Sequence, residues 1–251
     1  TNEDIEELKE YIKILLKKES LKATLKKTHR KELWLMPSEV IKYGLLDNGF
    51  EIVVYHDVIS KTVAVFNPGK QEERDLKRPR KRPLLSISIR LAKILINLSG
   101  ATKGQKLLDP FCGYGILLQE ALLMGIDVVG LDIDKKCVSA TRENLEWLKK
   151  RYGAKGNFEL YCGDCRKLSE ILKEKVDAIA TEPYLGPLLR GKISVKEARL
   201  RIEKLRKLYA DFLNEARKVL KEGKRLVIIT PVFKVGKEEF RVDLKKYTVY
   251  K

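Results

Sequence analysis

From residue 84 onward, short apolar segments rich in branched and aromatic residues alternate with longer amphipathic segments. The short segments have the composition of buried strands, and the longer ones repeat apolar residues with the period of an α-helix. The predicted strands are 106–109, 128–132, 158–161, 176–181 and 225–230, and the predicted helices are 84–98, 116–124, 135–151 and 195–220. Because parallel strands need helical crossovers, this alternation predicts an α/β domain over residues 81–251 with a parallel sheet between layers of helices.

The first 80 residues follow a different pattern, which predicts a small α/β module. We expect a helix over 1–27, a short helix over 37–46, and strands over 50–55 and 62–66. The segment RDLKRPRKR at 74–82 is typical of a basic linker, with a proline at its centre. The predicted organisation is therefore a module with a basic linker, residues 1–80, followed by the larger domain.

The formal net charge of +17 favours a polyanionic partner such as a nucleic acid, since each phosphate that a protein neutralises releases a counterion. The first cluster of candidate binding residues lies in the linker and comprises Arg74, Lys77, Arg78, Arg80, Lys81 and Arg82. A second cluster comprises Arg190, Lys192, Lys196, Arg199 and Arg201. Glu197 and Glu203 could instead make that second cluster an ordinary solvated helix face.

Several classes of protein do not fit the sequence. It has no apolar run long enough to predict a membrane span, and its acidic start, TNEDIEELKE, is unlike a secretory signal, so we expect a cytoplasmic protein. Cys162 and Cys165 have metal-binding spacing, but a structural zinc needs four ligands and no second pair accompanies them, so we expect no metal. Abundant Lys, Glu, Arg and Ile resemble the composition of proteins from thermophiles.

The segment Asp109-Pro110-Phe111-Cys112-Gly113-Tyr114-Gly115 joins a predicted strand to a predicted helix. Glycines in such a turn let the backbone bend tightly and approach a ligand closely. Asp132 ends the next predicted strand, where a carboxylate can accept both ribose hydroxyls of a nucleoside. Together these features predict a nucleoside cofactor rather than an ordinary turn.

The details of this turn favour S-adenosylmethionine over a dinucleotide. A dinucleotide-binding turn prefers a third glycine at the helix start, and Leu118 stands there instead. The acidic Asp109 suits the cationic ammonium and sulfonium groups of S-adenosylmethionine, which carries no phosphate. Asp164, after the next strand, could accept a hydrogen bond from the adenine amine, or could simply cap the helix that follows it.

A second segment, Thr181-Glu182-Pro183-Tyr184-Leu185-Gly186-Pro187, follows the fourth predicted strand of the domain. Hydrogen bonds from an exocyclic amine to Glu182 and to the carbonyl of Pro183 could direct the lone pair of that amine toward a methyl donor. Tyr184 could stack on an extruded base. We interpret Glu182, Pro183 and Tyr184 as the catalytic residues, the alternative being a proline-rich loop whose tyrosine covers the core.

The chain resembles the tRNA guanosine-N2-methyltransferases of the guanosine-10 type and the related RNA methylases that carry a THUMP domain. The resemblance rests on RDLKRPRKRPLLSISIRLAKILINL, LLDPFCGYGILLQEAL, VVGLDID, YCGDCRKL and TEPYLGP. It implies a Rossmann-like class I methyltransferase fold, a tRNA substrate, a cofactor site at Asp109, Phe111, Gly113, Gly115, Asp132 and Asp164, and a target-base site at Glu182–Tyr184. We assign the flanking Pro110, Cys112, Ile133 and Cys165 to the same cofactor site. Some related enzymes work with a small activator protein.

The catalytic motif departs from that family, whose usual Asp-Pro-Pro-Tyr is replaced here by Glu182-Pro183-Tyr184-Leu185. The departure leaves two alternatives beside transfer to the N2 amine of guanosine. One is transfer to the N6 amine of adenine, which uses the same kind of loop. The other is a non-catalytic RNA-binding scaffold on a methyltransferase fold.

Overall fold

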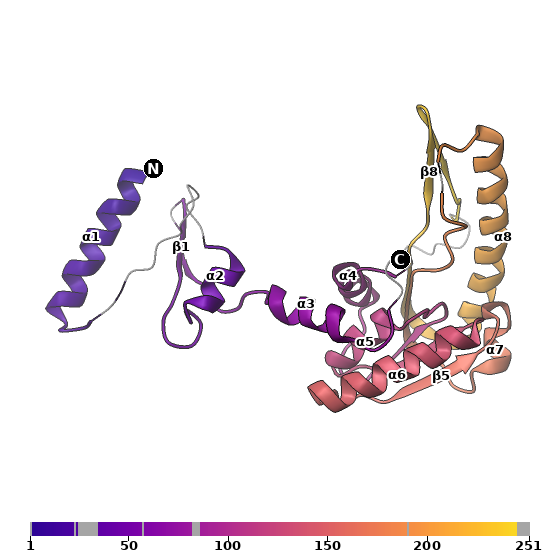
Figure 1. The fold of residues 1–251 in the computed structure, drawn as a ribbon, viewed down its shortest axis with the longest axis horizontal. Coiled ribbons are helices and arrows are strands. Elements are labelled where there is room, and N and C mark those ends of the chain that lie inside the picture. The colour runs from indigo at the N-terminus through magenta and orange to yellow at the C-terminus, as the bar shows by residue number, and fades with distance from the viewer. Residues whose placement is uncertain are drawn as a thin grey trace. The chain divides into compact units, whose positions relative to one another are not determined.

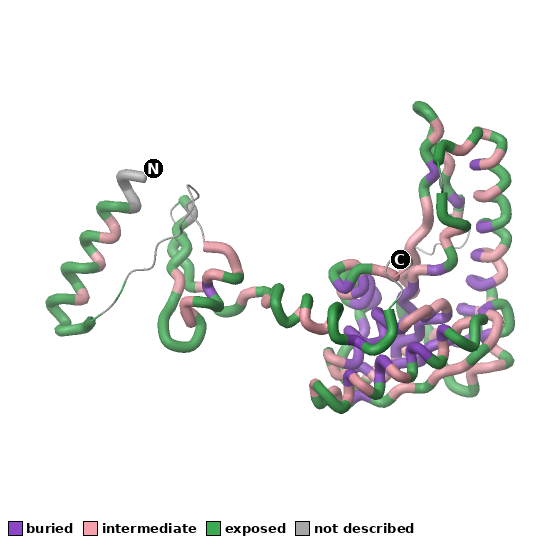
Figure 2. Tube along the Cα trace, in the orientation of Figure 1, coloured by how far each residue is buried: buried purple, intermediate pink, exposed green. Residues whose placement is uncertain are grey.

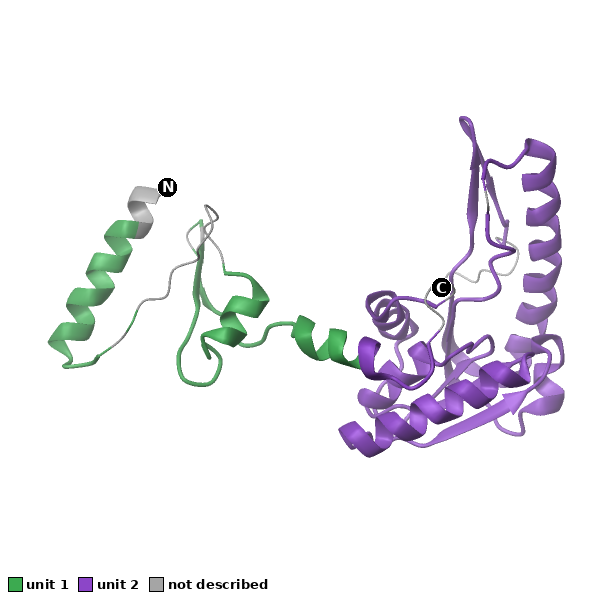
Figure 3. Ribbon diagram, in the orientation of Figure 1, with its two compact units in different colours: residues 1–74 green, residues 75–251 purple. Residues whose placement is uncertain are grey.

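The computed structural model describes residues 2–22, 24, 35–56, 58–81, 86–189 and 191–244 (Figure 1). The buried residues lie mainly in the later part of the chain (Figure 2). The chain divides into two compact units, Thr1–Arg74 and Asp75–Lys251 (Figure 3). None of the described helices is both long and apolar enough to cross a lipid bilayer.

The first unit contains short elements and very little core. Its elements are α1 (Asn2–Lys18), α2 (Pro37–Lys42), the antiparallel pair β1 (Ile52–Tyr55) and β2 (Val58–Lys61), and most of α3 (Pro68–Lys77). Among its described residues, Val40 is the one buried hydrophobic side chain. A two-stranded hairpin of this kind has little stability of its own.

Four predictions for this unit are wrong in their bounds. The short helix ends at Lys42 rather than at residue 46. The first helix ends at Lys18 rather than at residue 27. The second strand is Val58–Lys61 rather than 62–66, because a tight turn at His56, with φ of 52°, pairs Tyr55 directly with Val58. The first four residues of the predicted linker, 74–77, instead end the helix α3 (Pro68–Lys77), which begins after Asn67, whose side chain accepts the Lys70 N–H at 3.0 Å, with Pro68 at the first helical position.

The second unit is built on a five-stranded parallel sheet, as predicted. The strands are β3 (Lys106–Asp109), β4 (Asp127–Asp132), β5 (Phe158–Cys162), β6 (Val176–Thr181) and β7 (Leu220–Ile228). Their order is β5-β4-β3-β6-β7. From β3 the chain moves toward one edge of the sheet through β4 and β5, then returns to the other side of β3 with β6 and β7. β7 begins at Leu220 rather than at residue 225, because a register shift lets both Leu220 and Arg225 pair with β6.

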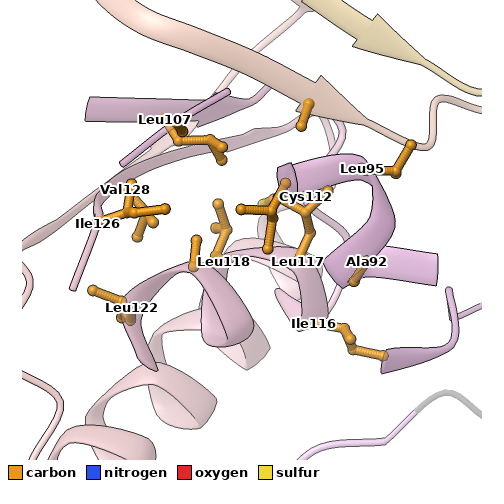
Figure 4. Close-up of a cluster of buried hydrophobic side chains, with 14 of the residues drawn as sticks. Ala92, Leu95, Leu107, Cys112, Ile116, Leu117, Leu118, Leu122, Ile126 and Val128 are labelled. Carbon is orange, nitrogen blue, oxygen red and sulfur yellow. The ribbon is translucent and has the colours of Figure 1, made fainter. Parts of the chain in front are cut away.

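Helices cover both faces of the sheet. They are α4 (Ile89–Ser99), α5 (Ile116–Leu123), α6 (Lys135–Tyr152), the short η2 (Cys165–Lys167) and α7 (Leu168–Ile171), and α8 (Val195–Val219). α4, α5 and α6 pack on the face that carries Leu107 and Val128, where Figure 4 shows side chains such as Leu117 and Leu118 gathered. η2, α7 and α8 pack on the face that carries Leu108. α4 begins later than residue 84, because the Ser88 hydroxyl caps it by accepting the Leu91 N–H.

The antiparallel hairpin of β8 (Val232–Val235) and β9 (Glu238–Arg241) forms a sheet of its own. Its side chains join the first half of α8 in a separate apolar cluster that contains Leu205, Tyr209 and Phe233. In Figure 1 the hairpin and the first half of α8 extend together beyond the five-stranded sheet. We call residues 195–209 of α8 and the hairpin the arm.

Candidate active site

Two segments that are far apart in sequence meet at the edge where the strand order reverses. Asp109 ends β3 and Glu182 follows β6, and these two strands are neighbours in the sheet. Open α/β sheets bind their ligands at this switch point, beyond the carboxyl ends of the strands. A pocket lies here, lined by Ser86, Ile87, Asp109, Phe111, Cys112, Gly113, Tyr114, Ile116, Leu117 and Glu182. The predicted glycine turn and the predicted catalytic loop therefore share one pocket.

The glycine turn is held against the end of β4. Gly113 and Gly115 have φ angles of 52° and 76°, which favour glycine. The Gly113 N–H donates to Asp132 Oδ2 at 2.9 Å, and the Asp134 N–H donates to Asp132 Oδ1 at 2.9 Å. Each carboxylate oxygen retains a second lone pair, so Asp132 can still accept bonds from a ligand.

Two polar residues of α6, which the sequence analysis missed, fix this turn from behind. Thr141 donates its hydroxyl to the Gly113 carbonyl at 2.7 Å, and Asn144 donates its amide to the Tyr114 carbonyl at 2.9 Å. Both are fully buried. The sequence could have revealed them, because both are polar residues at helical positions that face the core, on the same side of the helix as the buried Leu145 and Leu148.

Asp109 is a buried carboxylate that lacks a cationic partner among the described residues. It is 4% exposed, and its Oδ1 accepts both the Thr181 hydroxyl at 2.6 Å and the Phe111 N–H at 3.1 Å. Burial raises its pKa to about 7, an effect that these hydrogen bonds oppose and the charges of Asp132 and Glu182 increase slightly. Thr181, which immediately precedes Glu182, thus joins the catalytic loop to the carboxylate of the glycine turn.

We expect Asp109→Asn to remove a pH-dependent loss of stability. Because the folded state raises the pKa of Asp109 from 3.8 to about 7, ionisation weakens the fold progressively between these two values, and the loss is complete above the higher one. Relative to the wild type, the free energy of unfolding of the Asn variant should rise by on the order of 3 kcal/mol between about pH 5 and about pH 8. Denaturant titrations of both proteins at the two pH values would measure this. A difference that is independent of pH would mean that Asp109 ionises normally in the fold.

The predicted catalytic loop places its three residues in different environments. Glu182 is half-buried in the pocket, and burial raises its pKa. Pro183 is buried, whereas Tyr184 is 56% exposed. The fully buried Tyr209 of α8 donates its hydroxyl to the Tyr184 carbonyl at 2.8 Å, a support that the sequence analysis missed.

The predicted residues at the end of β5 lie apart from the pocket lining. Both oxygens of Asp164 accept bonds from Arg166, and Oδ1 also accepts the Arg166 N–H at 2.9 Å, which caps η2. These bonds lower the pKa of Asp164. The capping alternative therefore describes the observed contacts, and contact with an adenine amine stays a prediction. Cys165 is buried and Ile133 is 71% exposed.

The linker arginines are not uniformly available for RNA. Arg78 is 7% exposed and pairs with Asp75 at 3.0 Å, so its guanidinium faces the protein rather than solvent. Arg80 is exposed but binds Glu143 at 2.7 Å, and Lys81 donates to the Leu76 carbonyl. Arg82 and Arg190 lie outside the described residues.

The charges of the pocket lining indicate the kind of ligand it suits. Among the residues that the structure describes, its lining includes two carboxylates, Asp109 and Glu182, and no lysine or arginine. A phosphate group would be repelled by this uncompensated negative charge, whereas a cationic ligand would pair with the buried carboxylate of Asp109. Within the described ranges, no group of three or more His, Cys, Asp or Glu side chains is placed to hold a metal ion.

Comparison with known proteins agrees with this arrangement. The RMKL-like methyltransferase domain family matches residues 78–241. A tRNA (guanine(10)-N2)-dimethyltransferase of Methanothermobacter thermautotrophicus is 42% identical over 177 residues, which cover 69% of this chain and 47% of that protein. A probable tRNA (guanine(10)-N2)-dimethyltransferase of Methanothermococcus thermolithotrophicus is 37% identical over 109 residues, covering 43% of this chain and 67% of that protein.

Among solved structures, the crystal structure of TrmN from Thermus thermophilus aligns with a TM-score of 0.47 and 28% identity, over 59% of this chain and 40% of that one. This chain spans about half the length of the M. thermautotrophicus relative. The sequence identities and the family match confirm the resemblance predicted from the motifs. The chain belongs to the family of RMKL-like methyltransferase domains.

Proposed function

We propose that this chain transfers a methyl group from S-adenosylmethionine to the exocyclic N2 amine of a guanosine in tRNA. The observation that carries the proposal is the single pocket shared by the glycine turn, the buried Asp109 and Glu182. The names of the similar proteins supply the substrate class. The net charge of +17 supports an RNA partner.

The residues of the pocket fit S-adenosylmethionine. Asp109 Oδ2 accepts no hydrogen bond from the described residues and is free to meet the ammonium or sulfonium cation. A Cβ at Gly113 would meet no atom within 4 Å, so the backbone there is open to close approach by a ligand. Asp132 would accept the ribose hydroxyls. When bound, the cofactor supplies an electrophilic methyl group on a sulfonium.

Glu182 and Pro183 would then aim the target amine. The Glu182 carboxylate and the Pro183 carbonyl would each accept one N–H of the exocyclic amine, which turns its lone pair toward the pocket. The carbonyl of the next residue, Tyr184, is already held by Tyr209, so the loop keeps one shape while the Tyr184 ring stays exposed for stacking on the base. Positioning of this kind can supply much of the rate because the methyl group is already activated.

The test is nucleoside mass spectrometry of tRNA incubated with the protein and isotopically labelled S-adenosylmethionine. Labelled N2-methylguanosine or N2-dimethylguanosine is the expected product. Labelled N6-methyladenosine would overturn the choice of base and support the alternative enzyme. Absence of both products, together with no cofactor binding by calorimetry, would support the scaffold alternative.

The RNA contacts of the linker, at Arg74, Lys77, Arg80 and Lys81, are also part of this proposal. For Arg80, phosphate binding would replace its exposed ion pair with Glu143, an exchange of low cost because surface pairs contribute little. A small activator protein and a cytoplasmic location belong to the proposal as well.

A further inference from the structure

The arm is joined directly to the catalytic loop. Beyond the Tyr209–Tyr184 bond, Arg201 donates to the Pro187 carbonyl at 3.0 Å. Gly186, with φ of 100°, lies against Phe233 and Leu205 of the apolar cluster of the arm. The loop therefore runs along α8 from Tyr209 toward the amino end of the helix. A substrate bound at the catalytic loop would lie close to the arm.

The acidic side chains of the arm are largely neutralised by its own arginines. Glu197 pairs with Arg201 at 2.6 Å, Glu203 pairs with Arg206 at 2.6 Å, and Glu239 pairs with Arg241 at 2.6 Å. These pairs leave the remaining lysines of the arm to dominate its electrostatic potential.

Three exposed lysines, Lys196, Lys204 and Lys207, follow one face of α8, opposite the face that packs in the apolar cluster. None of them has an ion-pair partner within the described part of the chain. From Lys196 to Lys207 the helix makes about three turns and rises roughly 16 Å. That length accommodates two to three successive phosphates of a nucleic acid strand, estimated roughly from an extended backbone.

We propose that the Lys196–Lys204–Lys207 stripe binds the phosphodiester backbone of the RNA that flanks the target nucleotide. The inference rests on the proposed function for the identity of the RNA. The free cations favour RNA over an apolar protein partner, because Leu200 is the one large exposed apolar residue on that face of α8 among the described residues. Its neighbours one turn away are charged, namely Lys196, Lys204 and the arginine-paired Glu197 and Glu203. The stripe extends binding beyond the linker. Because it lies on the face of α8 turned away from the catalytic loop, the bound strand would pass from the loop around the helix to reach it.

The experiment compares two triple variants. Lys196→Gln, Lys204→Gln and Lys207→Gln together remove the charge of the stripe, and glutamine keeps the helix propensity. The matched control is Lys103→Gln, Lys155→Gln and Lys175→Gln, which removes three exposed lysines that precede β3, β5 and β6, at the opposite edge of the sheet. Binding of an unmodified tRNA transcript is measured by fluorescence anisotropy as a function of salt, alongside cofactor affinity and methyl-transfer kinetics.

The stripe variant should lower the slope of log affinity against log salt by about 2 to 3, and raise KM for tRNA roughly tenfold. Its cofactor affinity and its kcat at saturating tRNA should match the wild type, and the control variant should bind tRNA normally. Equal slopes for the stripe variant and the wild type, or equal losses in both triple variants, would overturn the proposal. Failure of the wild type to bind tRNA would overturn the proposed function as well. If the wild type methylates tRNA and the stripe variant binds tRNA as the wild type does, only the stripe proposal is overturned.

Discussion

Replacing Glu182 with alanine is expected to lower the rate of methyl transfer by about 10²- to 10³-fold while changing cofactor affinity by no more than about threefold. Glu182 lines the pocket, and its carboxylate is proposed to accept from the target amine, so its loss should misdirect the lone pair while leaving Asp109 and Asp132, the residues proposed to bind the cofactor, in place. Single-turnover transfer to tRNA and calorimetry with S-adenosylmethionine measure the two effects separately.

Glu182→Gln is the matched control for this change. Glutamine keeps the size of the side chain and one acceptor oxygen, so a substantial part of the activity should remain. Tyr184→Phe, which preserves the stacking ring, should also remain active. Transfer at the wild-type rate by the alanine variant would show that another group aims the amine.

Gly115→Ala is expected to weaken cofactor binding by about 3 kcal/mol, roughly a hundredfold. The φ of Gly115 is 76°, and an added Cβ would lie 2.7 Å from Thr141 Cγ2. Either the turn or α6 must shift, which breaks the bond between Thr141 and the Gly113 carbonyl. Calorimetric titration with S-adenosylmethionine gives the loss, and thermal unfolding gives the accompanying cost in stability.

Two comparisons separate strain from steric overlap. Gly113→Ala carries a positive φ of 52° but meets nothing within 4 Å in the protein, so it should cost the fold only the backbone strain. Adding Thr141→Ser to Gly115→Ala removes the overlapping methyl group and should restore part of the binding. If Thr141→Ser restores nothing, overlap with α6 is not the reason that position 115 requires glycine.

The predictions that held for the second unit depend on local pattern. Each strand of the sheet has apolar neighbours that alternate between faces, as Leu107 and Leu108 do, and each helix repeats its apolar residues with its own period. The bounds that failed depend on single caps and turns. Asn67 begins α3 and the turn at His56 ends β1, and a propensity pattern does not distinguish these from a linker or a longer loop.

The amino-acid sequence alone determined the parallel sheet, the glycine turn and the positions of Asp109, Asp132 and Glu182 at strand ends, because these follow from periodicities within short stretches. Tertiary structure alone decided how these residues are held. The Thr181–Asp109 bond joins residues 72 positions apart, and the raised pKa of Asp109 results from burial by elements distant in sequence. Tertiary structure also buries the Arg78 side chain and pairs Asp164 with Arg166. Such contacts depend on which helices and strands pack together in the folded protein, and the pattern of residues within one short segment does not determine that packing.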